Sequence, residues 1–434
     1  MSTVLAAKFL CAIDAQISPN KVGGTETHVP LQLDALARHS KDRFLVLGLK
    51  GRGSELAPYL GDNMELREYP RPYAWYRPGA YDRFAPAPAW RRLLGYAGPI
   101  RGLATEAMRR FGGGNGPMWP SAAENDRFLG PGDVRVVHFP YPQYFETSLP
   151  FVYEPWGLPH RHFPEMFATG EPEWMDALFR RGCERARIIV TATRWIKADI
   201  VSAYGVSPDK ILVLPRLPLF ARPEEPPPKP EKHGDQAESF ALFPSATWPH
   251  KNHLGLVRGL ARLRDVHGLR LNLVCTGKTN TPIFPEIQAE IARHGLADQI
   301  RFLGPIPRRR LEQLFKTALF LVHPSKFEGF GLPLVEALQF GTPILASRSA
   351  CIPEVLGDAA LFFDTNDPDS MAAAFKQALE SPALLDDLRR LGQSRLVAFP
   401  SHEQLAERFV AIYKRAGGLP LSPAERQAVE EMIA

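Results

Sequence analysis

The chain has 434 residues, of which 45% are hydrophobic and 23% are charged. This balance is typical of globular proteins, and the length corresponds to two or three domains, so collagen-like, disordered and small disulfide-rich classes are excluded. Lys and Arg number 52 against 47 Asp and Glu, a surplus too small to indicate nucleic-acid binding from total charge. Anionic small ligands and an acidic membrane surface remain open as partners.

The cysteines and the N-terminus bear on the compartment. Cys11, Cys183, Cys275 and Cys351 are scattered and form no close pair of the kind that binds zinc or carries out redox chemistry. Residues 1–12 are too short for a membrane span and lack the basic start of a signal peptide. We therefore expect a cytoplasmic protein with no transmembrane segment and no metal.

The first half of the chain alternates short apolar runs with helix-like stretches, which predicts a parallel sheet covered by helices. A helix is expected over 27–38, directly after the first strand. The expected strands are 4–13, 44–49, 134–139, 151–153 and 188–191.

Residues 67–120 form a long insertion that mixes Arg with aromatic side chains. One interpretation is docking to an anionic membrane that carries a lipid-linked acceptor. The other is a solvated loop with ordinary aromatic packing beneath it, and the sequence does not decide between them.

Residues 223–238 are rich in Pro and charge, so neither a helix nor a strand can persist there, and we place a linker at this segment. The predicted domains are 1–222 and 239–398, followed by C-terminal helices in 399–434. Strands in the second domain are expected at 240–243, 269–275, 300–303, 319–323 and 343–346. The fold class is therefore α/β, with two similar parallel-sheet domains.

The most informative stretch is HPSKFEGFGLPLVEA, from His323 to Ala337, in which a strand leads through a glycine turn into a helix. Gly329 and Gly331 allow the backbone to approach a ligand closely. The free amides of Gly331, Leu332 and Leu334, with the positive end of the helix dipole, favour a phosphate. A dinucleotide fingerprint is not indicated, because Leu334 stands where the third glycine would be.

Two carboxylates, Glu328 and Glu336, flank this turn. Their separation, roughly 12 Å at ~1.5 Å per helical residue, exceeds the roughly 5 to 9.5 Å of a glycosidase acid/base pair. Two carboxylates beside a phosphate would repel it unless each bound sugar hydroxyls. Two Glu side chains holding different sugars on either side of a diphosphate satisfy this condition.

The stretch resembles the E-x7-E motif of the retaining glycosyltransferases of family 4, also called glycosyltransferase group 1. Further likenesses are Gly23-Gly24-Thr-Glu after the first strand, Trp248-Pro-His-Lys-Asn-His253, and Gly341-Thr-Pro343. The resemblance implies a GT-B fold, in which two Rossmann-like domains face each other across a cleft. It also implies that the helices of 399–434 cross back to the first domain, with Leu405, Phe409, Ile412 and Tyr413 as an apolar stripe.

The resemblance assigns roles to individual residues. Glu336 would hold the ribose of a nucleotide, Glu328 would contact the donor sugar, and Gly329, Phe330, Gly331 and Leu332 would hold the diphosphate. Gly23 and Gly24 would lie in a flexible loop that closes on the donor, although two glycines after a strand alone indicate only a turn.

Lys251 resembles the family lysine that neutralises the departing diphosphate. Many members place an Arg five residues earlier, where this chain has Ala246, so Lys251, the helix dipole and His250 are left to stabilise the leaving group. The alternative is that Lys251 is a solvated lysine at a helix start.

The family commonly has His-Asp upstream of Pro-Glu, near the reacting carbon, but here Trp156-Gly157 occupies that position. His160 and His162 remain as the catalytic candidates, with His138 as a third. A lone His is more often structural than catalytic.

The resemblance thus implies a retaining, metal-independent hexosyltransferase without a cofactor, acting in cell-surface polysaccharide synthesis. Its expected partners are a nucleotide diphosphate sugar, with a mannose-like hexose favoured, and a glycan or lipid-linked acceptor. Contact with the inner face of the membrane is a further expectation, and nucleic acid is not. The alternatives are a sugar-nucleotide epimerase with the same fold and a non-catalytic glycan-binding member.

Overall fold

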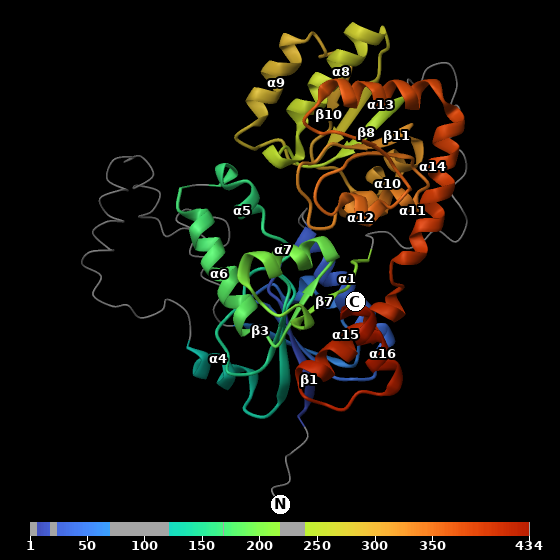
Figure 1. The fold of residues 1–434 in the computed structure, drawn as a ribbon. Coiled ribbons are helices and arrows are strands. Elements are labelled where there is room, and N and C mark those ends of the chain that lie inside the picture. The colour runs from blue at the N-terminus through green and yellow to red at the C-terminus, as the bar shows by residue number, and fades with distance from the viewer. Residues whose placement is uncertain (1–6, 18–23, 70–120, 168, 218–238, 434) are drawn as a thin grey trace, which may run out of the picture.

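The computed structural model describes residues 7–17, 24–69, 121–167, 169–217 and 239–433. The predicted linker, 223–238, lies outside the described residues, as do Gly23 and all of the expected insertion beyond residue 69. The chain forms two lobes, one above the other in Figure 1, and the last helices lie beside the lower, N-terminal lobe. Each lobe contains one parallel sheet.

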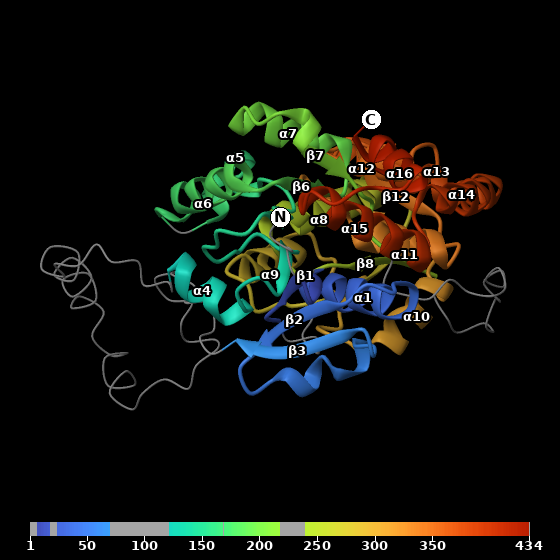
Figure 2. The same cartoon turned by 90° about the horizontal axis from the view of Figure 1, so that it is seen from below.

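The N-terminal sheet has seven parallel strands among the described residues, in the order β3-β2-β1-β4-β5-β6-β7. Strand β1 pairs Cys11 with Phe44 of β2 on one side and with Val136 of β4 on the other. Figure 2 shows β3 at the outer edge, beside β2. The strands are β1 (Phe9–Ala15), β2 (Phe44–Leu49), β3 (Met64–Tyr69), β4 (Val134–Phe139), β5 (Phe151–Tyr153), β6 (Ile188–Thr191) and β7 (Ile211–Val213).

The helices of this lobe begin where the sequence supplies partners for the first backbone amides. Thr193 caps α7, since its hydroxyl accepts from the amide of Ile196, and Ser121 forms a capping box with Glu124 at α4. The first helix begins at Gly24, earlier than the expected residue 27. The helices are α1 (Gly24–His39), α4 (Ala122–Leu129), α5 (Pro159–His162), α6 (Glu171–Arg185) and α7 (Arg194–Tyr204).

The C-terminal sheet has six parallel strands in the order β10-β9-β8-β11-β12-β13. Its strands are β8 (Phe240–Pro244), β9 (Asn272–Thr276), β10 (Ile300–Phe302), β11 (Phe320–His323), β12 (Ile344–Ser347) and β13 (Leu361–Phe363). Its helices are α8 (His253–His267), α9 (Phe284–Arg293), α10 (Arg308–Thr317), α11 (Leu332–Gln339), α12 (Ile352–Leu356), α13 (Pro368–Glu380) and α14 (Pro382–Arg395). The predicted α/β class with two parallel sheets is confirmed.

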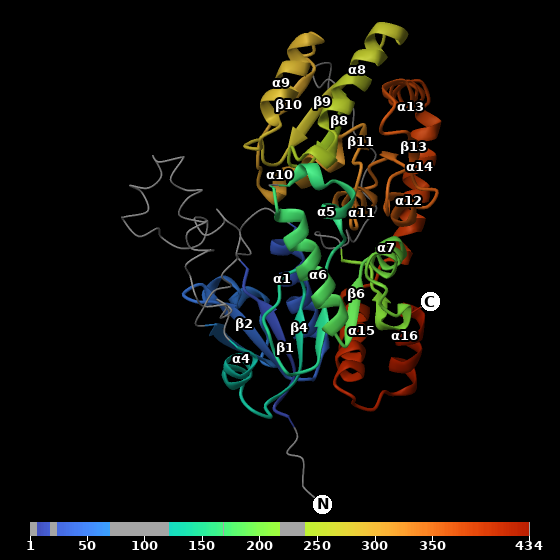
Figure 3. The same ribbon diagram turned by 60° about the vertical axis from the view of Figure 1, so that its left-hand side comes forward.

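The last two helices, α15 (His402–Ala416) and α16 (Pro423–Ile433), pack on the N-terminal lobe. The stripe of Leu405, Phe409, Ile412 and Tyr413 is buried in one apolar cluster with residues of β1, β2 and α1. Figure 3 shows α14 running down the side of the C-terminal lobe toward these helices. We keep the domain limits given above as a proposal, because the segment between the two sheets is not described.

None of the helices in the described part of the chain combines the length and the apolar character that a membrane span requires.

Candidate active site on the glycine turn

The glycine turn, defined as residues 327–331, connects β11 to α11. Gly331 precedes the helix with φ +83°, a left-handed conformation in which a side chain would be strained, so this position favours glycine. On this turn, Glu328 lies with Oε1 at 2.6 Å from Nζ of Lys251 and 2.8 Å from Nε2 of His323. The turn thus brings together two of the predicted catalytic residues, Glu328 and Lys251.

The electrostatics of this contact keep Glu328 ionised. Burial alone would raise the pKa of Glu328, but the Lys251 ammonium and the hydrogen bond from His323 outweigh it and hold that pKa well below its usual range. His250 does not supply the second cation that we expected: burial and the neighbouring Lys251 lower its pKa to about 3. Lys251 is therefore the charged member of this pair at neutral pH.

The position of Lys251 is set by a short 3₁₀ turn, Pro249–Lys251, just before α8. Asn252, the next residue, caps α8 by accepting from the amide of Gly255, and its own amide group donates to both oxygens of Thr365, at 2.8 and 2.9 Å. The amide of Lys326 donates to the carbonyl of His250 at 2.7 Å, which ties this loop to the glycine turn.

Side chains from neighbouring strands and loops also hold the backbone that leads into the glycine turn. The carbonyls of Pro324, Ser325 and Glu328 accept hydrogen bonds from side chains of the strands and loops beside β11. Their donors are the hydroxyl of Thr365, the hydroxyl of Ser347 at 2.6 Å and the thiol of Cys351 at 3.0 Å. These three hydrogen bonds hold the chain on this side of the turn from within its own domain.

The anion site predicted from the free amides is partly corrected. The amide of Leu334 is not free, because it donates to the carbonyl of Gly331 at 2.9 Å and closes the first turn of α11. The amides of Gly331 and Leu332 have no hydrogen-bond partner among the described residues. Two amides and the start of α11 thus remain for an anion.

Glu336 lies in the first turns of α11 and is 4% exposed. Its carboxylate has no hydrogen-bond partner in the described part of the structure. Burial raises the pKa of Glu336 to about 7, against the pull of Arg308 in the opposite direction. A buried carboxyl without a partner is costly to keep, which makes Glu336 the strongest candidate here for a ligand contact.

The two predicted histidines lie on the N-terminal lobe and face that lobe's own carboxylates. Nε2 of His160 is 3.5 Å from Asp176, and burial lowers the pKa of His160. Nε2 of His162 lies 3.0 Å from both oxygens of Asp199. Neither histidine contacts Glu328 or Lys251 among the described interactions, so their catalytic roles stay predictions.

Trp156 and Gly157 stand where the resembling family commonly has His-Asp, and the structure shows what these two residues do instead. Trp156 and Gly157 both have positive φ, +65° and +123°, and the indole of Trp156 donates to the carbonyl of Pro140. The Arg216 guanidinium lies over this indole, 4.1 Å from a ring centroid. The segment therefore forms a turn shaped for packing.

Sequence reasoning missed a buried polar network, the Glu154 centre, which we define as Glu154, Arg216, His28 and His138. Glu154 directly follows β5, and its oxygens lie 3.2 Å from Arg216, 3.4 Å from His28 and 3.1 Å from His138. Burial would raise the pKa of Glu154, but the two histidines and Arg216 hold it well below its usual range. His138, our third histidine candidate, belongs to this centre.

Other predicted positions add less. Gly24 is the first residue of α1, and Ala246 is half-buried in the loop after β8, so it supplies no cation. Phe330 is 5% exposed and packs in the apolar core of the C-terminal lobe, which assigns its side chain to folding. Among the described residues, no three His, Cys, Asp or Glu side chains gather as metal ligands.

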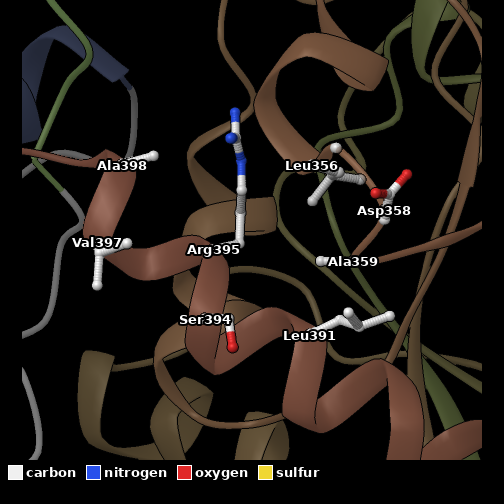
Figure 4. Close-up of a pocket in the computed structure, with 9 residues that line it drawn as sticks. Leu356, Asp358, Ala359, Leu391, Ser394, Arg395, Val397 and Ala398 are labelled. Atoms are coloured by element: carbon white, nitrogen blue, oxygen red, sulfur yellow. The ribbon is translucent and has the colours of Figure 1, made fainter.

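One hollow of about 250 Å³ lies away from these residues, between the end of α12 and the segment from α14 to the 3₁₀ turn Leu396–Ala398 (Figure 4). Its lining includes Asp358, Ser394 and Arg395 and none of the predicted site residues.

Residues 227–395 match the family model described as glycosyl transferases group 1. O-antigen chain mannosyltransferase B of Escherichia coli is 27% identical over 54% of this chain and 61% of the relative. The chain thus spans about three fifths of the length of that relative.

Solved structures extend the likeness to both lobes. Sucrose-phosphate synthase from Thermosynechococcus elongatus matches with a TM-score of 0.67 at 17% identity, over 93% of this chain and 98% of that one. Anabaena HepE, solved in complex with UDP-glucose, matches with a TM-score of 0.60 at 15% identity, over 93% and 98%. At these identities the likeness shows the fold, and the fold is GT-B.

Proposed function

We propose that the chain is a glycosyltransferase that moves a sugar from a nucleotide diphosphate sugar to a hydroxyl group of an acceptor. The observation that carries this proposal is the pairing of Lys251 with the ionised Glu328, beside two open amides and the unpartnered Glu336. The match of residues 227–395 to the family model and the UDP-glucose complex of the structural neighbour HepE support the choice of donor.

In this proposal, each group acts on one part of the donor. The amides of Gly331 and Leu332, at the start of α11, bind the diphosphate. Lys251 has three N–H donors, so it can hold Glu328 and a phosphate oxygen together. Glu336 accepts from the ribose hydroxyls, and Glu328 accepts from a hydroxyl of the donor sugar.

The chemistry that these residues can supply is electrostatic. Negative charge grows on the diphosphate as the glycosidic bond breaks, and Lys251 with the two amides stabilises it without reorganisation. The acceptor hydroxyl attacks the anomeric carbon from the face that the leaving group vacates, and a phosphate oxygen takes its proton. This step gives retention and uses no metal, and the family resemblance supports both features.

The finer assignments rest on relatives. The name of the Escherichia coli relative supports a mannose-like hexose and a glycan or lipid-linked acceptor in cell-surface polysaccharide synthesis. We further propose that the enzyme works at the cytoplasmic face of the membrane and that residues 67–120 contact this membrane.

The test incubates the full chain with UDP-glucose or GDP-mannose, with and without octyl α-mannoside as a lipid-like acceptor, and with and without EDTA. We expect release of nucleoside diphosphate that depends on the acceptor and survives EDTA, and an α-linked product by NMR. Conversion of the donor without acceptor and without release of nucleoside diphosphate would instead indicate the epimerase. No turnover despite donor binding would indicate the non-catalytic member.

A further inference from the structure

The glycine turn divides its two aromatic side chains between the two lobes. Phe330 packs in the core of the C-terminal lobe and contacts Phe399 edge-on, with ring centroids 6.0 Å apart. Phe327 is 5% exposed but belongs to the apolar cluster of the N-terminal lobe. A loop of the second domain therefore contributes a core residue to the first.

The socket of Phe327 is built from the segment after β5 and from the start of α7. Its ring centroid lies 5.2 Å from that of His162, 5.7 Å from Trp195 and 6.2 Å from Phe163. A Cβ at Gly157 would stand 3.4 Å from the Phe327 ring, an ordinary van der Waals distance, so Gly157 lies directly against this ring. These contacts explain why Phe327 is buried although its neighbours in sequence belong to the other lobe.

Two further contacts join the lobes at the same place. A Cβ at Gly329 would lie 2.2 Å from the carbonyl oxygen of Trp156, so only glycine allows this approach. Glu354 of α12 accepts from the first two amides of α7, those of Arg194 at 2.7 Å and Trp195 at 2.8 Å. The turn and α12 thus hold the rim of the Phe327 socket.

Glu328 stands between these contacts. Its backbone neighbours on both sides, Phe327 and Gly329, touch the N-terminal lobe, while its carboxylate binds Lys251 and His323 of the C-terminal lobe. Successive Cα atoms are about 3.8 Å apart, so Phe327 cannot leave its socket without moving Glu328.

We infer that Phe327 is a positioning residue, whose insertion into the socket of the N-terminal lobe sets the place of Glu328 when the lobes are closed. This inference rests on the proposed function, because Glu328 is there a donor contact. Opening the lobes withdraws Phe327 and releases Glu328 from its position against the donor sugar. Closure and a competent site therefore form together.

The test compares Phe327→Ala with Phe327→Leu, which fills part of the socket, and with Phe375→Ala. Phe375 of α13 is buried as well, but it packs within the C-terminal lobe alone, so it is the matched control for lost packing. A dye pair at Glu173→Cys in α6 and Glu286→Cys in α9 reports the distance between the lobes. The native cysteines are all buried, so the dyes label the introduced thiols.

We expect Phe327→Ala to lengthen the dye distance and to lower kcat by about 10²-fold, the effect of a misplaced site, with less than a threefold change in the donor KM. Phe327→Leu should recover part of both, and Phe375→Ala should keep the wild-type distance and kcat in its folded fraction. A wild-type distance and kcat in Phe327→Ala would overturn the inference, and so would an equal kcat loss in Phe375→Ala.

The dye distance is measured first without ligand and then with UDP-glucose and GDP-mannose. If the wild type turns over neither donor, the proposed function fails, yet the distance without ligand still decides whether Phe327 holds the lobes together. If the wild type is active and Phe327→Ala equals it, the inference alone fails.

Discussion

In each lobe, a buried carboxylate follows an interior strand of the sheet and is kept ionised by a cation and by histidine. The Glu154 centre follows β5, and Glu328 follows β11 with Lys251 and His323. The two differ in access, since the side chains of Glu154 and Arg216 are 3% and 7% exposed, against 10% and 18% for Glu328 and Lys251.

The partners of the two carboxylates differ in the same way. The Glu154 centre continues through His138 to Gln32 and Tyr413, which joins α1, β4 and α15 within one lobe. Glu328 instead lies on the turn that leads to the two open amides, and the unpartnered Glu336 is nearby in sequence. The same kind of contact thus stabilises the fold in one lobe and remains open to a ligand in the other. We call the Glu154 centre the closed centre. The open centre is the site of Glu328, Lys251, His323 and Glu336 with the two open amides.

The largest effect should come from breaking the closed centre. Arg216→Met keeps an apolar stem against Trp156 but leaves Glu154 buried without a cation, which should cost about 3 to 5 kcal/mol of unfolding free energy. Urea unfolding followed by tryptophan fluorescence measures this loss. Arg390→Met, at the exposed pair with Asp387, is the control and should change stability little. Equal losses in the two variants would mean that Glu154 needs no cation.

Lys251→Ala should break the open centre in a different way. We expect kcat to fall by about 10²-fold or more, because the growing charge on the diphosphate loses one stabilising group. Steady-state rates of nucleoside diphosphate release check this, and Lys251→Arg, which keeps the charge, should retain more activity. A higher KM at unchanged kcat would make Lys251 a ground-state binding group.

The sequence located the open centre well, because its residues lie in continuous motifs. The order strand, glycine turn, helix placed Glu328 and Glu336 correctly on the turn and on α11, and Lys251 correctly before α8. The role of His323 was missed, although it stands in the same motif, because its contact with Glu328 depends on how the turn folds back.

The closed centre could not be found in this way. Its members are separated by up to 188 residues, from His28 to Arg216, and meet only when α1, β4, β5 and the segment after β7 converge. One signal was present, namely an acidic residue directly after the buried run of β5.

The missed strands have a local cause. The edge strand β3 (Met64–Tyr69) alternates apolar with charged residues, so it produces no continuous apolar run. The other two, β7 and β13, are three-residue strands at the edges of their sheets. α15 was found by its stripe, and its burial follows from the empty position that it fills beside α1.

A smaller effect is expected where the open centre meets the ribose. Glu336→Ala should weaken donor binding by roughly 1 to 3 kcal/mol, because ribose hydroxyls would be left without an acceptor. Titration calorimetry with UDP-glucose and GDP-mannose measures it, and Glu336→Gln, which keeps one acceptor oxygen, should lose less. Unchanged affinity in both variants would contradict the assignment of Glu336.

The smallest effect distinguishes the two centres by pH. Burial raises the pKa of Glu336 from 4.5 to about 7, so its contribution to stability is fully present below pH 4.5 and is lost as pH rises through 7. Between pH 6 and pH 8, the ligand-free protein should lose about 1.4 kcal/mol relative to Glu336→Gln, which cannot ionise. Glu154 and His28 should not respond in this range, since the pKa of Glu154 lies well below its usual value and that of His28 is lowered to about 4. Unfolding of both proteins by urea at the two pH values gives the difference, in which all other titrating groups cancel. A constant difference would show that Glu336 does not change its ionisation between pH 6 and pH 8, and would contradict a folded-state pKa of about 7.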